Sequence, residues 1–174
     1  LNITNNEVYN AAIGLLIDDA GNYDGNVTGN TFITNNDIPE HLDASGAIRT
    51  DYFGIRVFNT FASGLFSQND FVNAAQDQVA NRYFGMYLNN ASLTASNNNF
   101  TNMERSFDVT GANSLVTIEG NTIEYTFRTY ADMMPIRITN ANTVIVEGNS
   151  LTNSSLGAAP SQQWLQTAMF IDAS

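Results

Sequence analysis

The sequence predicts an all-β fold, a parallel β-helix (solenoid) of about six rungs with an asparagine ladder. Three observations lead to this prediction: asparagine is unusually abundant, one short motif recurs six times, and a second short block follows each copy. Apolar and polar residues alternate with period two around both blocks, which is typical of strands. No amphipathic helical pattern separates the strands, so a doubly wound α/β sheet is excluded.

Composition limits the classes of function. The 174 residues include 43% hydrophobic residues, enough to bury the core of one domain. The chain contains 17 acidic residues and six basic residues, all of which are arginine, so its net charge is −11. Nucleic-acid binding needs clustered positive charge and is excluded as a leading function, and binding to anionic membranes is disfavoured by the same sign. No apolar run approaches the roughly 20 residues of a membrane span.

The absence of cysteine excludes a disulfide scaffold, a thiol nucleophile and a thiolate zinc site. Asparagine occurs 25 times and proline only three times. Asparagine favours turns and tolerates the left-handed backbone region, so this excess indicates a chain that turns often.

The first repeated block reads Asn, any residue, then a bulky apolar residue. The intervals between its asparagines are 24, 39, 29, 23 and 28 residues, which indicates a turn of fixed size with insertions in some copies. The six asparagines are Asn6, Asn30, Asn69, Asn98, Asn121 and Asn149. We expect them to stack at one corner, each amide bonding its neighbours one rung away.

Two residues after each asparagine, the apolar positions predict an inward column. Its members are Val8, Phe32, Phe71, Phe100, Ile123 and Leu151. The second block reads small residue, apolar, any residue, apolar, as in Gly54-Ile55-Arg56-Val57 and Gly85-Met86-Tyr87-Leu88. Each rung therefore contributes equivalent strands, which pair in parallel with the next rung at about 4.8 Å.

The segments Gly-Asn-Thr-Phe (29–32), Glu-Gly-Asn-Thr-Ile (119–123) and Glu-Gly-Asn-Ser-Leu (147–151) resemble the repeats of the right-handed parallel β-helix proteins of the pectate-lyase-like superfamily. The resemblance covers essentially the whole chain. It implies a right-handed coil but no single activity, because that superfamily includes polysaccharide lyases, glycoside hydrolases, epimerases, phage tailspikes and surface adhesins.

The residue between the apolar positions of the second block is predicted to point outward. These residues form the column Leu16, Arg56, Tyr87, Asp108, Arg137 and Phe170. Aromatic rings stack on sugar faces and arginine binds carboxylates bidentately, so Arg56, Tyr87, Asp108 and Arg137 are the candidate contacts for an acidic glycan. The alternative is that these charges only form modest cross-strand pairs and keep the face soluble.

The insertions fall between the two blocks, at roughly 33–53, 72–84, 124–134 and 152–167. We expect them to form a wall of loops beside the outward column, with Asp51, Arg82, Arg105 and Asp132 as its charged members. Asp37, Glu40 and Asp43 in the longest insertion offer oxygen ligands for Ca²⁺, although no calcium-loop spacing is present. His41 is the only histidine and is interpreted as a solvated loop residue.

The expected function is an extracellular structural or adhesive module, secreted or at the cell surface, with a possible carbohydrate-binding face and no required cofactor. The alternative is part of a polysaccharide lyase, glycoside hydrolase or epimerase acting on an acidic polysaccharide. The resemblance implies a lysine or arginine base for a lyase, and lysine is absent here. A glycosidase needs two carboxyls about 5 to 5.5 Å apart for retention or about 6.5 to 9.5 Å apart for inversion. Asp51 and Asp132 are expected three rungs apart, roughly 14 Å, which is too far for a direct pair.

The acidic, cysteine-free and lysine-free composition favours an exported protein. The repeats fill residues 1–174 as one β-helix domain, and we expect this domain to be a segment of a longer solenoid. Exposed strands at the ends of a coil also make end-to-end self-association possible. The predicted partners are a polysaccharide or cell-surface glycan and, at the ends of the coil, a second copy of the chain.

Overall fold

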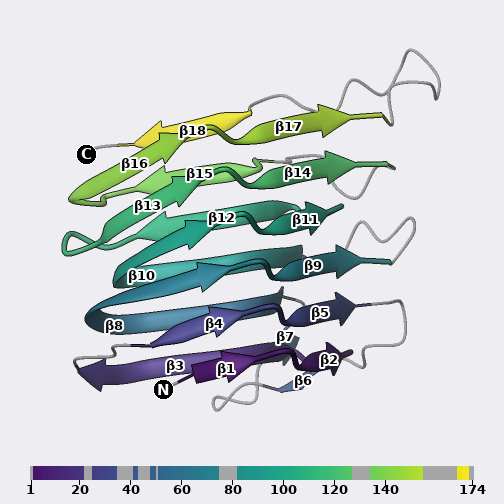
Figure 1. Ribbon diagram of the computed structural model, residues 1–174, viewed down its shortest axis with the longest axis horizontal. Helices are drawn as coiled ribbons and strands as arrows, with labels where there is room; N and C mark the ends of the chain where they lie inside the picture. The colour runs from purple at the N-terminus through teal and green to yellow at the C-terminus, as the bar shows by residue number, and fades with distance from the viewer. Residues whose placement is uncertain are drawn as a thin grey trace.

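The computed structural model describes residues 2–21, 25–34, 41–42, 48–49, 51–74, 82–126, 134–154 and 168–172. Across these ranges the regular structure is entirely β, and no helix long and apolar enough to cross a membrane is found there. The strands form a right-handed parallel β-helix, as predicted (Figure 1). The chain climbs through six rungs, each made of three short strand segments.

The first three rungs contain the longest strands. Rung 1 holds β1 (Asn2–Thr4), β2 (Glu7–Tyr9) and β3 (Ile13–Gly21), and rung 2 holds β4 (Asn26–Thr28), β5 (Thr31–Thr34) and the first half of β8 (Asp51–Ser67). Rung 3 holds the second half of β8, β9 (Asp70–Asn73) and the first half of β10 (Arg82–Ser96). Both β8 and β10 thus continue from one rung into the next without a break.

The last three rungs repeat this plan. Rung 4 holds the second half of β10, β11 (Asn99–Thr101) and β12 (Arg105–Thr110). Rung 5 holds β13 (Leu115–Glu119), β14 (Thr122–Tyr125) and β15 (Ile136–Thr139), and rung 6 holds β16 (Thr143–Glu147), β17 (Ser150–Asn153) and β18 (Met169–Asp172). In the longest insertion, β6 (His41–Leu42) and β7 (Ile48–Arg49) form a small antiparallel pair.

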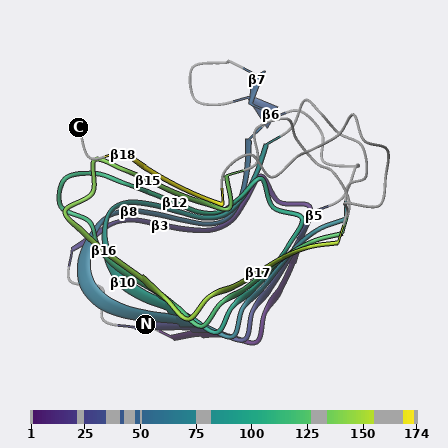
Figure 2. The same cartoon turned by 90° about the horizontal axis from the view of Figure 1, so that it is seen from above.

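Equivalent strand segments stack on one another in three stacks, named first, second and third after their order within a rung. The second stack is the six-stranded sheet, and the first and third stacks share the ten-stranded sheet because β8 and β10 run through both. The described pairs between rungs are parallel, and the register shifts only within the long pairs β3–β8 and β8–β10. Figure 2 shows the rungs lying over one another around a common interior.

The interior is filled by columns of apolar side chains. The predicted column pairs residue by residue from Val8 to Leu151, and its central ring, Phe71, is fully buried. The Phe71 ring stacks between Phe32 at 5.1 Å and Phe100 at 4.7 Å between centroids. The column exists because each rung places a bulky apolar residue two positions after its corner asparagine.

The asparagine ladder is continuous. The side-chain amide of each ladder asparagine donates to the Oδ1 of the next one, from Asn6 to Asn30 at 2.9 Å through to Asn121 and Asn149 at 2.9 Å. The same Oδ1 also accepts the backbone N–H of the asparagine one rung before, and each inner amide donates to a first-stack carbonyl such as that of Phe66. Both hydrogen-bonding ends of each buried inner amide are therefore satisfied, as burial requires.

The residue before each ladder asparagine adopts the left-handed backbone conformation, with φ between 54° and 68°. These residues are Asn5, Gly29, Gln68, Asn97, Gly120 and Gly148. A left-handed residue turns the chain sharply, and asparagine and glycine adopt this region most easily. The corner therefore accounts for part of the asparagine and glycine content.

Candidate functional site

The outward column of the third stack is aligned as predicted. Leu16, Arg56, Tyr87, Asp108, Arg137 and Phe170 are direct partners in successive rungs. The apolar residues on either side of them, such as Ile55 and Val57, are fully buried, so the column occupies the opposite face of the strands. This arrangement brings residues up to 154 positions apart in sequence onto one continuous surface (170 − 16 = 154).

Aromatic rings surround Arg56 on this face. Phe53 stacks on Phe84 with 4.9 Å between centroids, and Tyr87 contacts both Phe53 and Phe58 at 5.6 Å. The Arg56 guanidinium carbon lies 4.4 Å from the Phe58 ring centre, 4.9 Å from that of Phe53 and 5.6 Å from that of Tyr87. We call these four residues, Phe53, Phe58, Phe84 and Tyr87, the aromatic shelf. Cation–π attraction holds the arginine against it.

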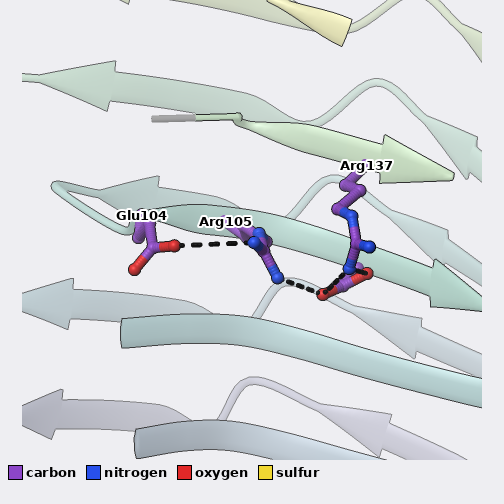
Figure 3. A network of polar contacts seen from close by, with 4 residues as sticks. Glu104, Arg105 and Arg137 are labelled. Atoms are coloured by element: carbon purple, nitrogen blue, oxygen red, sulfur yellow. Dashed lines mark hydrogen bonds and ion pairs between the residues drawn. The ribbon is translucent and has the colours of Figure 1, made fainter. Parts of the chain in front are cut away.

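An ion cluster made of Glu104, Arg105, Asp108 and Arg137 lies on the next two rungs (Figure 3). Arg105 Nη1 donates to Asp108 Oδ2 at 2.7 Å, and Arg137 Nη1 lies 3.3 Å from Oδ2 and 3.4 Å from Oδ1 of the same carboxylate. Arg105 Nη2 lies 3.7 Å from Glu104 Oε1, and its guanidinium carbon is 5.0 Å from the Phe84 ring centre. Arg105 thus joins the ion cluster to the aromatic shelf.

Exposure differs sharply among the charged residues of the ion cluster. The side chain of Arg137 is 33% exposed, that of Arg105 13% and that of Asp108 only 1%. Asp108 therefore occupies its predicted position, but the two arginines cover its carboxylate. Among these residues, Arg137 offers a ligand the most accessible charge.

The charges of the molecule are divided between its faces. All six arginines of the sequence lie after the second strand of a rung and before the first strand of the next. Among the described residues, the outward positions of the first and second stacks carry only acidic charges, at Glu7, Asp70, Glu119, Glu124 and Glu147. Among the described side chains of the three stacks, an anionic ligand meets opposite charge only on the third-stack face.

A buried tyrosine lies close to the ion cluster. The Tyr125 hydroxyl donates to the Met103 carbonyl at 2.8 Å. Burial raises the pKa of Tyr125 well above its usual range, and the nearby Glu104 carboxylate adds to this rise. The phenol therefore stays neutral and acts as a fixed hydrogen-bond donor.

The predicted loop wall is described only in part. Asp51 and Arg82 begin β8 and β10 and are direct backbone partners, and Arg105 begins β12 within the ion cluster. Asp132 lies outside the described residues, as do Asp37, Glu40 and Asp43, so the calcium site stays a prediction. Within the described ranges, no three His, Asp or Glu side chains gather as a metal site would require.

The aromatic shelf residues Phe53, Phe58 and Phe84 were not among the sequence candidates. The tripeptide Tyr-Phe-Gly occurs at 52–54 and again at 83–85, directly before two copies of the second block. Because the two tripeptides have the same offset from the second block, this repetition indicates that their aromatic residues pair in neighbouring rungs. In the structure it places Tyr52 on Tyr83 in the interior, with centroids 5.2 Å apart, and Phe53 on Phe84 in the shelf.

No protein-family model, curated protein or solved structure matches this chain. The fold and the arrangement of the third-stack face are therefore the basis for any functional assignment.

Proposed function

We propose that this chain is a structural or adhesive module of an extracellular β-helix protein of the pectate-lyase-like type, and that its third-stack face binds an acidic glycan. The observation that carries the proposal is that Arg105 and Asp108 join the aromatic shelf to Arg137, whose side chain is partly exposed. Flat rings match the apolar faces of sugars, and a guanidinium matches a carboxylate.

The charge distribution supports an anionic partner. With a net charge of −11, the protein repels anions in general, and the clustered arginines of the third-stack face oppose that repulsion locally. Because Arg105 and Asp108 already pair with each other, much of their charge cancels. We therefore expect weak binding that salt reduces further.

A glycan array probed with the chain, with and without Ca²⁺, tests this proposal. We expect acidic oligosaccharides to bind and Arg137→Gln or Tyr87→Ala to reduce that binding about tenfold, the loss of roughly one charge-assisted hydrogen bond or one ring contact. Glu124→Gln on the exposed second-stack face is the matched control, and its binding should equal that of the unchanged chain. Binding that these variants leave unchanged would refute the assignment of the site.

One observation favours a second candidate function, a polysaccharide-modifying enzyme. Two buried carboxylates, those of Glu104 and Asp108, lie beside the same Arg105 guanidinium in the third stack. Paired carboxyls are the usual apparatus of glycoside hydrolysis. Incubation with acidic polysaccharides distinguishes the two functions, because new reducing or unsaturated ends indicate an enzyme and binding without turnover indicates the module.

End-to-end self-association, in which the last rung of one molecule pairs with the first rung of another, is a separate proposal. Light scattering over a range of protein concentrations tests it, since head-to-tail association increases the mean mass without a fixed upper limit.

A further inference from the structure

The outward column presents a different group to the ligand at each rung. Arg56 lies on rung 2, Tyr87 on rung 3, Asp108 on rung 4 and Arg137 on rung 5. We infer that this order selects a sparsely acidic glycan, in which uncharged sugars separate the acidic ones, over a chain with an acid on every sugar. This inference rests on the proposed function and specifies its ligand.

The two ends of this stretch can each meet an anionic group. At rung 5 the Arg137 side chain is one-third exposed, and of its guanidinium nitrogens only Nη1 is bonded to Asp108. At rung 2 the Arg56 side chain is partly exposed and its guanidinium rests on the aromatic shelf. The Arg56 Nε is buried, which leaves the outer edge of the guanidinium for contact with a ligand.

On the two rungs between them, the outward column itself holds no cation. Tyr87 presents a ring and a hydroxyl group, and Asp108 is an acid whose charge Arg105 and Arg137 already balance. Arg105 itself is largely covered, because it packs on Phe84 and bonds Asp108 at 2.7 Å. A carboxylate placed over either rung would lose water without gaining a charged partner.

The spacing of the rungs turns this order into a specificity. Neighbouring rungs are about 4.8 Å apart, which is close to the advance per sugar of an extended glycan. A glycan lying along the column therefore places roughly one sugar on each rung. An acid on every sugar would leave two carboxylates opposite Tyr87 and Asp108, whereas acids separated by two or three uncharged sugars avoid that cost.

Calorimetric titration with four linear oligosaccharides of matched length tests the inference. The probes are cello-oligosaccharides without acids, gellan oligosaccharides with one acid in each four-sugar repeat, hyaluronan oligosaccharides with an acid on every second sugar, and oligogalacturonate with an acid on every sugar. We expect gellan oligosaccharides to bind tightest and oligogalacturonate about tenfold more weakly, the consequence of one poorly compensated charge.

Two variants that add a cation at different rungs should change this preference differently. Tyr87→Arg introduces a guanidinium between Arg56 and Arg137 and should strengthen oligogalacturonate binding several-fold. Leu16→Arg is the comparison variant, since Leu16 is 50% exposed and adjoins Arg56 on the side away from Tyr87. It should strengthen the binding of every acidic probe while leaving the preference for gellan oligosaccharides in place. Glu124→Gln again serves as the control.

Each outcome decides a different point. Equal or tighter binding of oligogalacturonate by the unchanged chain overturns the inference while leaving the proposed function intact. If cello-oligosaccharides bind as tightly as gellan oligosaccharides, the aromatic shelf binds sugars without selecting for charge, and this result also overturns the inference. If no probe binds, the proposed function fails together with the inference.

Discussion

Gly54 lies directly beneath the ring of Phe71, on the neighbouring rung, and a Cβ atom at Gly54 would collide with Phe71 Cδ1 and Cε1. The same relationship joins Gly14 to Phe32 and Gly85 to Phe100. In the next two rungs the column residue is Ile123 or Leu151, and the preceding small position holds Ser106 or Pro135. The small position of the second block thus provides space for the aromatic column of the first.

Gly54→Ala should destabilise the protein by about 1 to 3 kcal/mol, because the core is closely packed and the ring must move. Phe71→Leu in the same chain should recover part of that loss by removing the colliding ring atoms. Urea denaturation of the two single variants and the double variant gives the coupling energy. Additive effects would show that the two residues do not compete for the same space.

Phe71→Ala should reduce the free energy of unfolding by about 3 to 5 kcal/mol, because it removes a fully buried ring that stacks on Phe32 and Phe100. Tyr9→Ala is the matched control, since Tyr9 lies on the outer face of the second stack and is 57% exposed. Equal thermal midpoints for the two variants would contradict the column.

Asn98→Ala should cost more than Asn6→Ala, although both remove one ladder amide. Asn98 is fully buried, accepts from both nitrogens of Asn69 and donates to Phe66 and Asn121, so its loss leaves several buried groups unpaired at about 1 to 3 kcal/mol each. Asn6 is exposed, and water can replace its bonds. Chemical denaturation of both variants measures the difference, and equal losses would refute this account of the ladder.

Asp108→Asn should destabilise the fold by about 3 kcal/mol, because it leaves two neighbouring arginines without their shared counter-charge. A second substitution, Arg137→Gln, should restore part of the stability by relieving the repulsion from Arg105. Thermal unfolding at low salt checks both effects. If Asp108→Asn leaves the thermal midpoint unchanged, the ion cluster contributes nothing to the stability of the fold.

Stability should fall at alkaline pH. The pKa of Tyr125 is higher in the folded than in the unfolded state, so its contribution is complete below the unfolded pKa of about 10 and is lost as pH rises above it. The expected slope from this single group is about 1.4 kcal/mol per pH unit. Tyr125→Phe should lower stability at neutral pH by about 1 kcal/mol and flatten the alkaline slope. An unchanged slope would place the titration elsewhere.

Much of the site geometry was predictable because it follows from the repeat. Arg56, Tyr87 and Arg137 align as expected, since equal offsets from the second block place residues at equal positions in successive rungs. The burial of Asp108 was not predictable, because it depends on Arg105, which reaches it from three residues earlier in the same strand. The repeat determines the backbone position of each residue, but it does not determine which neighbours the end of a long side chain contacts.

The sequence by itself determined the architecture: the spaced asparagines, the apolar column and the small residues each specify a local conformation that only a stacked coil satisfies together. Only the tertiary structure decided which charges remain accessible. Arg137 bonds Asp108 from the next rung, 29 residues further along the chain, and the two residues meet only once the coil has formed.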